Sequence, residues 1–298
     1  MTSPRRAPAS RGRRVFERLL VATDFSPTSG RALLFASQLL GRGGRIRLLH
    51  VLDARLQRDL SILLGVEKAA RASLDAARRA LRARGVRCDA RLEWGKPEAV
   101  IVREAKALRA SAVVCGTHGR RGVVRMLLGS VAERVLQTSA RPVLLVPHVS
   151  FRRAIRRVLV AMDFSPVSGA ALGSAEALCA SGEADLHVVH VLDPGLGAAY
   201  AFSAHPGFFE EMRRRREEAA RLFEEIRRRL SRRGVAHVLH LEQGDPAEKI
   251  LRLADKVNPD LLVVGTGGRR GFLRLFVGSV ARRVVRGTPC PLLATPPE

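Results

Sequence analysis

The chain has 298 residues, which is enough for about two domains of ordinary size. Apolar residues make up 46% of it, so it can bury a sizeable core and wholesale disorder is excluded. No uncharged apolar run reaches the roughly 18 residues of a membrane-spanning helix, and no apolar stretch follows the basic N-terminus as in a secretory signal. We therefore expect a cytoplasmic protein that has no membrane segment.

The charge is strongly positive. The 52 Lys and Arg residues against 28 Asp and Glu residues give +24, of which residues 1–150 carry +18 (29 basic, 11 acidic) and residues 151–298 carry +6 (23 basic, 17 acidic). Such a field favours anionic partners, a class that includes nucleotides, nucleic acids and acidic surfaces.

The four cysteines form no CxxC pair, so neither a zinc ribbon, a redox dithiol nor a disulfide framework is expected. We predict four small buried residues: Cys88, Cys115, Cys179 and Cys290.

In chain order, residues 1–14 are basic and contain Pro and Ser, and we expect them to be disordered. The apolar run LLVAT predicts a buried strand, after which Ser26 and Pro27 predict a helix cap and the first turn of a helix over Thr28–Leu40. The elements then alternate: a strand over 45–52, a helix over about 57–84, a strand over 86–94, a helix over 97–109, a strand over 111–115, a helix over 129–138 and a strand over 142–146. Strands separated by helices indicate βαβ crossovers and a parallel sheet covered on both faces.

The chain repeats itself. ERLLVATDFSPTSGRAL at 17–33 returns as RRVLVAMDFSPVSGAAL at 156–172, and VVCGTHGRRGVVRMLLGSVAERV at 113–135 returns as LVVGTGGRRGFLRLFVGSVARRV at 262–284. Each copy is the size of a domain, so the duplication predicts two tandem domains and not a solenoid. We place the domains at 15–148 and 156–298, with a linker at 149–155 so short that the domains should pack together.

Three features recur in both copies: an Asp after the first strand, the sequence HVLD at the exit of the second strand, and the spacing G-x2-G-x9-G-S after the fourth strand. We interpret the first glycine of this spacing as allowing a sharp turn of the backbone, and the second as allowing a ligand to approach the backbone closely. The last Gly-Ser is interpreted as the start of a helix whose unpaired N–H groups bind an anion. Arginines in the intervening loop match phosphate charge. Plain turn and helix-cap chemistry is the alternative, but two copies with identical spacing favour a phosphate site. The residues are Asp24, Gly116, Gly119, Arg120, Gly129 and Ser130, and in the second copy Asp163, Gly265, Gly268, Arg269, Gly278 and Ser279.

These motifs, in this order and twice over, resemble the universal stress protein family across about residues 15–148 and 154–295. The resemblance implies an α/β fold of two tandem open-sheet domains, each a five-stranded and mainly parallel sheet of order 3-2-1-4-5 with helices on both faces. Strands one and four then flank the point where the winding reverses, which is where such sheets bind ligands. It also implies that the two domains pack through their fifth strands; a homodimer of whole chains and an unidentified protein partner remain open.

The ATP-binding branch of that family implies a role for each matching residue. Residues 23–25 would line the adenosine, the Val51 backbone would bind adenine, and the glycine pattern would hold ribose and phosphates. No protein cage for a metal is implied, but Mg²⁺ would accompany ATP near Asp24 and Asp163. The implied nucleotide-binding residues are Thr23, Asp24, Phe25, Val51, Gly116, Gly119, Gly129, Ser130 and Val131, matched by Met162, Asp163, Phe164, Val191, Gly265, Gly268, Gly278, Ser279 and Val280.

Other functions are less well supported. No GxxxxGK[ST], HExxH or GxSxG motif occurs, and no general base stands at the phosphate end, so we assign no catalytic residue and expect a regulatory nucleotide-binding protein. Slow ATP hydrolysis or self-phosphorylation at Ser130 or Ser279 is the enzymatic alternative. Nucleic-acid binding is disfavoured because aromatic interleaving and a recognition helix are absent.

Two histidines, one in each copy, and two regions of the second copy need separate interpretations. We interpret His50 and His190 as satisfied core or crevice residues and the insertion at 194–209 as a longer connection, with a flap over a ligand as its alternative. The Arg-rich helix after it is expected to be a solvated helix of i,i+4 ion pairs and not a nucleic-acid patch. The expected pairs are Glu210/Arg214, Glu211/Arg215, Glu217/Arg221, Glu224/Arg228 and Glu225/Arg229.

Overall fold

The structure, a computed structural model, describes residues 16–53, 60–117, 128–148, 154–180, 184–194, 206–267 and 277–297. The expected disordered tail, most of the linker and the centre of the insertion at 194–209 lie outside these residues, so those predictions stay untested. None of the helices in the described residues is long and apolar enough to cross a membrane.

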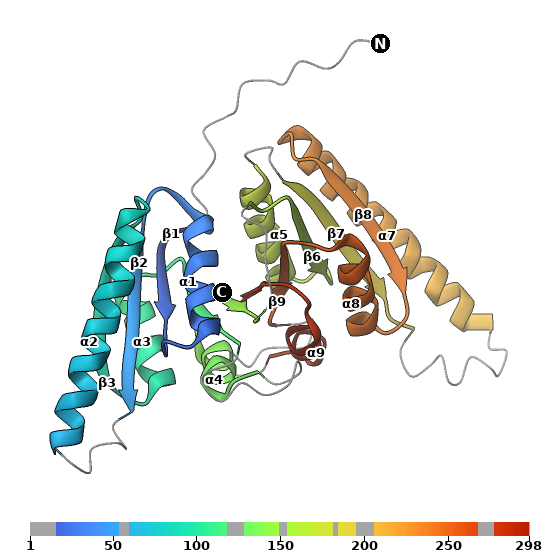
Figure 1. The fold of residues 1–298 in the computed structure, drawn as a ribbon. Coiled ribbons are helices and arrows are strands. Elements are labelled where there is room, and N and C mark those ends of the chain that lie inside the picture. The colour runs from blue at the N-terminus through green and yellow to red at the C-terminus, as the bar shows by residue number, and fades with distance from the viewer. Residues whose placement is uncertain are drawn as a thin grey trace, which may run out of the picture.

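Strands and helices alternate through both halves of the chain (Figure 1). The first half contains β1 (Phe16–Ala22), α1 (Pro27–Leu39), β2 (Leu40–Asp53), α2 (Leu60–Ala83), β3 (Arg87–Gly95), α3 (Pro97–Leu108), β4 (Ala112–Gly116), α4 (Ser130–Thr138) and β5 (Val143–Val146). The second half contains β6 (Arg157–Met162), α5 (Pro166–Cys179), β7 (Asp185–Leu192), α7 (Pro206–Arg232), β8 (His237–Gln243), α8 (Pro246–Val257), β9 (Leu261–Gly265), α9 (Ser279–Gly287) and β10 (Leu292–Thr295). The predicted α/β class is confirmed.

The strands form one sheet of order β3-β2-β1-β4-β5-β10-β9-β6-β7-β8. Pairing is parallel within each half, and β5 and β10 pair in the antiparallel sense through Leu145 with Leu292, Leu144 with Leu293 and Val143 with Ala294. The expected contact through the fifth strands is therefore confirmed, and it joins the two predicted sheets into a single ten-stranded one. Pairing of two whole chains stays a prediction.

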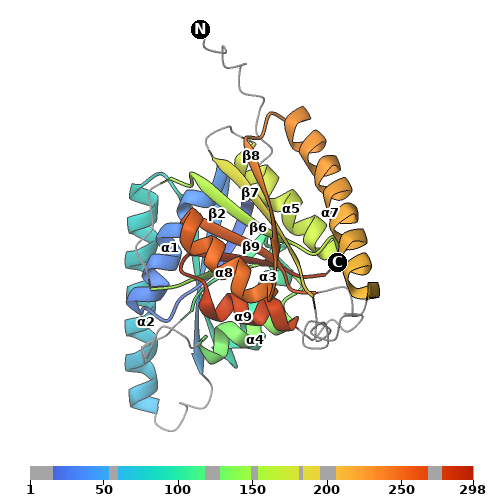
Figure 2. The same ribbon diagram turned by 90° about the vertical axis from the view of Figure 1, so that its right-hand side faces the viewer.

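Helices cover both faces of this sheet, as Figures 1 and 2 show. One core cluster takes buried side chains from α1, α2, α5 and α7, such as Phe35, Leu74 and Phe223. The other takes them from α3, α4, α8 and α9, such as Val135 and Val284. Each cluster contains residues of both halves, so the core is continuous across the β5–β10 junction. At the same junction the Arg286 guanidinium lies 3.2 Å from the Glu133 carboxylate, which joins α9 to α4.

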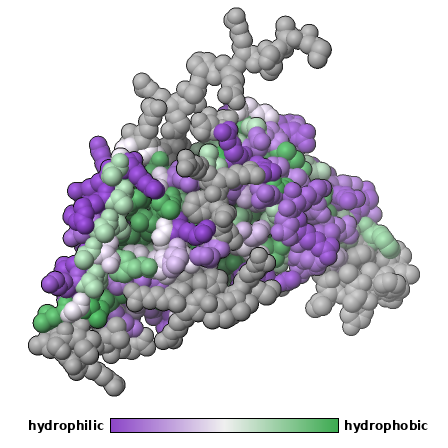
Figure 3. All heavy atoms as spheres, in the orientation of Figure 1, coloured by the Kyte–Doolittle hydropathy of each residue, from purple (hydrophilic) through white to green (hydrophobic). Residues whose placement is uncertain are grey.

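The Arg-rich helix α7 is exposed along most of its length, and hydrophilic residues gather over it in Figure 3. Arg214, Arg215 and Arg228 lie 2.8–3.8 Å from the glutamates four residues before them, which confirms three of the expected pairs. The expected pair of Glu225 with Arg229 is wrong. Arg229 lies 2.7 Å from Glu176 of α5 instead, because that buried carboxylate requires a cation.

Candidate functional site

In both halves an aspartate follows the first strand in the same tight turn. The Asp24 carboxylate accepts a 3.0 Å hydrogen bond from the Ser26 N–H, and Asp163 does the same with Ser165. The residue between the aspartate and the serine of each turn, Phe25 or Phe164, has a left-handed backbone conformation, with φ of 62° and 60° respectively. Such a conformation is costly for an aromatic residue and persists where the surroundings impose it. The turn thus holds each carboxylate at the carboxyl end of the sheet.

A histidine of the next strand fixes each turn from the other side. A carbonyl oxygen only accepts, so the His50 Nδ1–H donates to the Thr23 oxygen at 2.7 Å, and His190 donates to Met162 at 2.8 Å. The rings of Phe25 and His50 lie with their centroids 4.4 Å apart, and those of Phe164 and His190 are equally close. The interpretation of both histidines as satisfied crevice residues is confirmed.

Hydrogen bonds keep the Asp24 carboxyl in its charged form. Burial alone would raise the pKa of this group, but hydrogen bonds from Ser26 and Ser29 outweigh burial and hold the pKa below its ordinary value. The predicted cap of α1 is also present, because Ser26 Oγ accepts from the Ser29 N–H at 3.2 Å. A fixed, ionised carboxylate therefore stands at the start of α1.

The first glycine of each pattern has a different reason from the one expected. Neither Gly116 nor Gly265 has a positive φ, so the interpretation as a sharp turn is wrong. A Cβ on Gly265 would lie 3.0 Å from Val167 Cγ1 and 3.2 Å from the Ser168 nitrogen, and Gly116 meets the start of α1 in the same way. The glycine is needed because the helix start packs directly on the strand end.

The last glycine of each pattern begins a helix whose first N–H groups receive no side-chain cap. Gly129 is the N-cap of α4 and Gly278 that of α9. Both donate their own N–H to the residue that follows the preceding strand, Thr117 at 2.6 Å and Thr266 at 2.9 Å. The nearest atom to a Cβ on Gly278 would be 3.7 Å away, so the protein itself leaves room there. These are the features of an anion site at a helix start.

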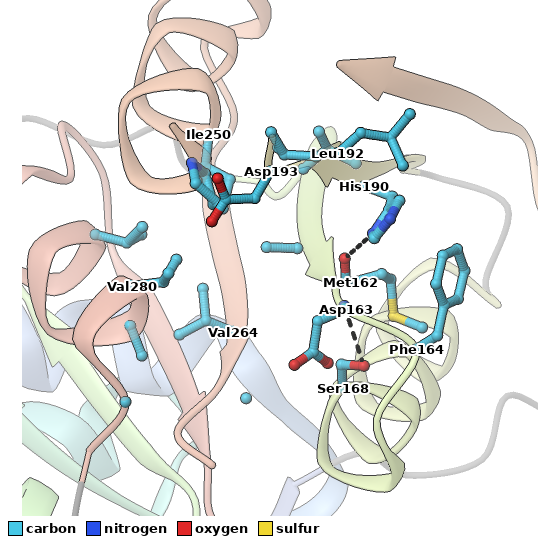
Figure 4. A pocket seen from close by; sticks show the side chains of 18 of the residues that line it. Met162, Asp163, Phe164, Ser168, His190, Leu192, Asp193, Ile250, Val264 and Val280 are labelled. Atoms are coloured by element: carbon cyan, nitrogen blue, oxygen red, sulfur yellow. Dashed lines mark hydrogen bonds between the residues drawn. The ribbon is translucent and has the colours of Figure 1, made fainter. Parts of the chain in front are cut away.

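A cavity of about 340 Å³ brings the predicted residues of the second half together (Figure 4). Its volume lies in the range of small-molecule sites. Its walls come from β6, β7, β9, the middle of α7 and the N-terminal parts of α5, α8 and α9. Among its lining residues are Met162, Asp163, Phe164, Val191, Gly265, Gly278, Ser279 and Val280.

The first half places its predicted residues on the equivalent elements. Asp24 and Phe25 follow β1 with Thr23, Val51 lies in β2, Gly116 ends β4, and Gly129, Ser130 and Val131 start α4. The loops that would complete both cradles are not described, so the predictions for Gly119, Arg120, Gly268 and Arg269 lie outside the described residues.

Sequence reasoning missed several lining residues. The apolar ones are Val189, Ile250 and Val264, and the residues from α7 are Arg215, Glu218, Ala219 and Leu222. The spacing of Ala219 and Leu222 indicates a buried helix face, but nothing in that spacing predicts that this face reaches the cavity.

Within the described residues, no cluster of three or more His, Cys, Asp or Glu is placed to hold a metal ion.

The four cysteines are buried and free, as predicted. Burial raises the pKa of the Cys115 thiol to about 12 and that of Cys88 to about 11. Neither is a thiolate at neutral pH, so neither is an activated nucleophile.

Comparison with known proteins agrees with this architecture. The sequence profile of the Universal stress protein family matches residues 16–147 and 154–296. Universal stress protein YxiE of Bacillus subtilis is 30% identical over 145 residues, which are 46% of this chain and 96% of that protein. A universal stress protein of Thermus aquaticus is 34% identical over 139 residues, again 46% of this chain and 96% of the relative.

A solved structure shares the fold over nearly the whole length. The crystal structure of a universal stress protein from Archaeoglobus fulgidus superimposes with a TM-score of 0.74 at 24% identity, covering 94% of this chain and 98% of that one. With two consecutive profile matches that together span most of its length, the chain belongs to the universal stress protein family.

Proposed function

We propose that this protein binds ATP at the carboxyl edge of its sheet, in the cavity of the second half and in the equivalent crevice of the first. The observation that carries the proposal is the composition of the second cavity. It has an uncapped helix start, an apolar middle, and three acidic lining residues, Asp163, Asp193 and Glu218.

The start of α9 suits the phosphates. The N–H groups of Ser279 and Val280 line the cavity, and the helix dipole favours a negative charge at that position. The exposed Ser279 hydroxyl supplies a further donor. Mg²⁺ bound to the phosphates would add a cation that the carboxylate of Asp163 complements.

The end of β7 suits the base. Leu192 O accepts from Gly244 N on the β8 side, so the backbone groups of the preceding Val191 face the opposite side, beyond the end of β6. In the first half, Leu49 O accepts from Thr23 N, and Val51 two residues later faces the same way. In each half one peptide N–H and one C=O are thus directed toward the edge of a planar base.

Catalysis is not part of the leading proposal. In the described part of the chain, the carboxylates and the histidine that line the cavity come from the ends of β6 and β7 and from α7, and the start of α9 itself supplies no general base for hydrolysis. We therefore propose a regulatory ligand that shifts the protein between states of different affinity for ATP. Self-phosphorylation is the second candidate, because Ser130 and Ser279 are exposed at the two helix starts.

Isothermal titration of the purified protein with ATP and Mg²⁺ tests the proposal. We expect binding that Gly129→Val and Gly278→Val together abolish while the melting temperature is kept. Gly173→Val on α5, where an added Cβ meets no atom within 4 Å, is the control and should bind normally. No binding, or binding unchanged in the double variant, contradicts the proposal, and radioactive label transferred to the protein from ATP would favour the enzymatic candidate.

A further inference from the structure

One face of α7 forms a wall of the second cavity. Arg215, Glu218, Ala219 and Leu222 recur at the spacing of a single helix face and all line the cavity. Ala219 is buried and Leu222 is half-buried, whereas Arg215 and Glu218 are exposed. The wall is therefore apolar inside and charged at the mouth.

This wall lies at the end of the cavity away from the phosphate site. The strand order β9-β6-β7-β8 puts the start of α9 beside β9, whereas α7 packs against β7 and β8. In Figure 4, Val280 and Val264 lie on one side of the pocket and His190 and Phe164 on the other. A nucleotide with its phosphates at α9 thus directs its base toward α7.

The two charged residues at the mouth differ in how they are held. Arg215 lies 2.8 Å from Glu211 and donates to the Asp193 carbonyl at 3.4 Å, which ties α7 to the exit of β7. Glu218 makes no ion pair or hydrogen bond with any residue that the structure describes, although its neighbour Glu217 pairs with Arg213 at 2.9 Å. Its carboxylate is available to accept a hydrogen bond from a ligand.

The two matching positions of the first half carry no charge. The offset of 149 residues that aligns the strands after these helices places Val66 and Ala69 of α2 at the positions of Arg215 and Glu218. Both first-half side chains are exposed and neither has a polar atom. At these two positions a base in the first crevice therefore meets apolar side chains.

We propose that Glu218 is a specificity residue of the second site, where it accepts a hydrogen bond from the exocyclic amino group of adenine. The proposal rests on the proposed function. The amino group has two hydrogens, so the Val191 carbonyl and Glu218 can accept one each. A base with a carbonyl oxygen at this position would place that oxygen against the carboxylate and be rejected.

Each site is measured alone by closing the other, with Gly129→Val to isolate the second site and Gly278→Val to isolate the first. The probes are ATP and ITP, which differ in having an amino group or a carbonyl oxygen at this position. One charge-assisted hydrogen bond corresponds to about a tenfold change in affinity, so the preference for ATP should be about tenfold greater at the second site than at the first.

Glu218→Ala, which installs the first-half residue, should reduce the preference at the second site to that of the first. Glu218→Gln, whose amide donates as well as accepts, should likewise keep only the preference shown by the first site. Glu217→Ala, one residue away and paired with Arg213, should change nothing. An ATP preference that survives Glu218→Ala overturns this inference alone, whereas absence of ATP binding at both sites overturns the proposed function together with it.

Discussion

The two halves of the molecule share a backbone but use different chemistry beneath their equivalent helices α3 and α8. In the first half, Glu104 of α3 is only 6% exposed, and three arginines approach its carboxylate: Arg91 at 3.3 Å, Arg103 at 3.8 Å and Arg47 at 3.9 Å. In the second half the position of Glu104 is held by Leu253, and those of Arg47 and Arg91 by His187 and His240.

The histidine pair replaces a charged cluster by a neutral one. His187 Nδ1 lies 3.0 Å from His240 Nε2, and the rings are stacked within 15° of parallel. One ring nitrogen donates to the other, which requires that the pair carry at most one extra proton. The same place beneath the helix can therefore hold either a buried ion pair or a neutral hydrogen bond. Each solution requires that the carboxylate and its two strand partners be replaced together.

The largest expected effect comes from breaking the charged cluster of the first half. Glu104→Ala removes the buried carboxylate and leaves Arg47 and Arg91 without it, so we expect a loss of about 3 kcal/mol of unfolding free energy. Denaturant unfolding measures this loss. Glu93→Ala, which removes the half-buried partner of the exposed Arg103, is the control and should cost about 0.5 kcal/mol. Equal losses would show that burial of the cluster is unimportant.

The next effect concerns glycines that both halves keep. Gly265→Ala places a Cβ 3.0 Å from Val167, so we expect a loss of about 1–3 kcal/mol from overpacking. Gly278→Ala meets no atom closer than 3.7 Å and should leave stability nearly unchanged while weakening ATP binding. Thermal unfolding and titration of the two variants separate a packing glycine from a ligand glycine, and the reverse result would contradict that division.

A smaller effect should appear as the pH is lowered. Burial, and for His187 also the charge of His240, lowers the pKa of both histidines below the ordinary 6.5. The unfolded chain therefore binds more protons, and stability that is fully present above pH 6.5 is lost as the pH falls below it. Denaturant midpoints from pH 7.5 to 5.5 should fall more steeply for the wild type than for His240→Gln. Parallel slopes would exclude the pair as a source of acid sensitivity.

The smallest effect tests the helix starts. The first turn of α4 holds Glu133, where α9 holds Arg282, so an acidic residue opposes the positive end of the helix dipole at the proposed phosphate site of the first half. With the second site closed by Gly278→Val, Glu133→Gln should tighten ATP binding about twofold at low salt, and 0.5 M salt should remove the difference. A gain that is independent of salt would point to a cause other than charge.

Much of the fold could be predicted because local rules decide it. Apolar runs placed the strands to within two residues at most boundaries, and Ser26 with Pro27 fixed the start of α1. The early start of β2 at Leu40 was missed because it depends on pairing with Phe16, which no local pattern records. The repeat predicted which residues meet at the sheet edge but not the role of Gly116, since that depends on how closely α1 approaches β4.

The candidate site shows the same limit. The glycine spacing and the two aspartates were readable because short segments carry them. The contribution of α7 was not, since it requires the distance between a helix and a strand that lie far apart along the chain. The partner of Arg229 was missed for the same reason, because Glu176 lies on another helix.

The contact between Glu133 and Arg286 occurs only once. In a dimer of identical chains a two-fold axis would repeat every contact, with each residue facing the other's counterpart on both sides. Here the positions related by the pseudo-two-fold axis hold Arg282 and Gln137, which cannot form that ion pair. Covalent linkage of the halves thus removes the constraint of symmetry, and each crevice is free to diverge in the ligand that it prefers.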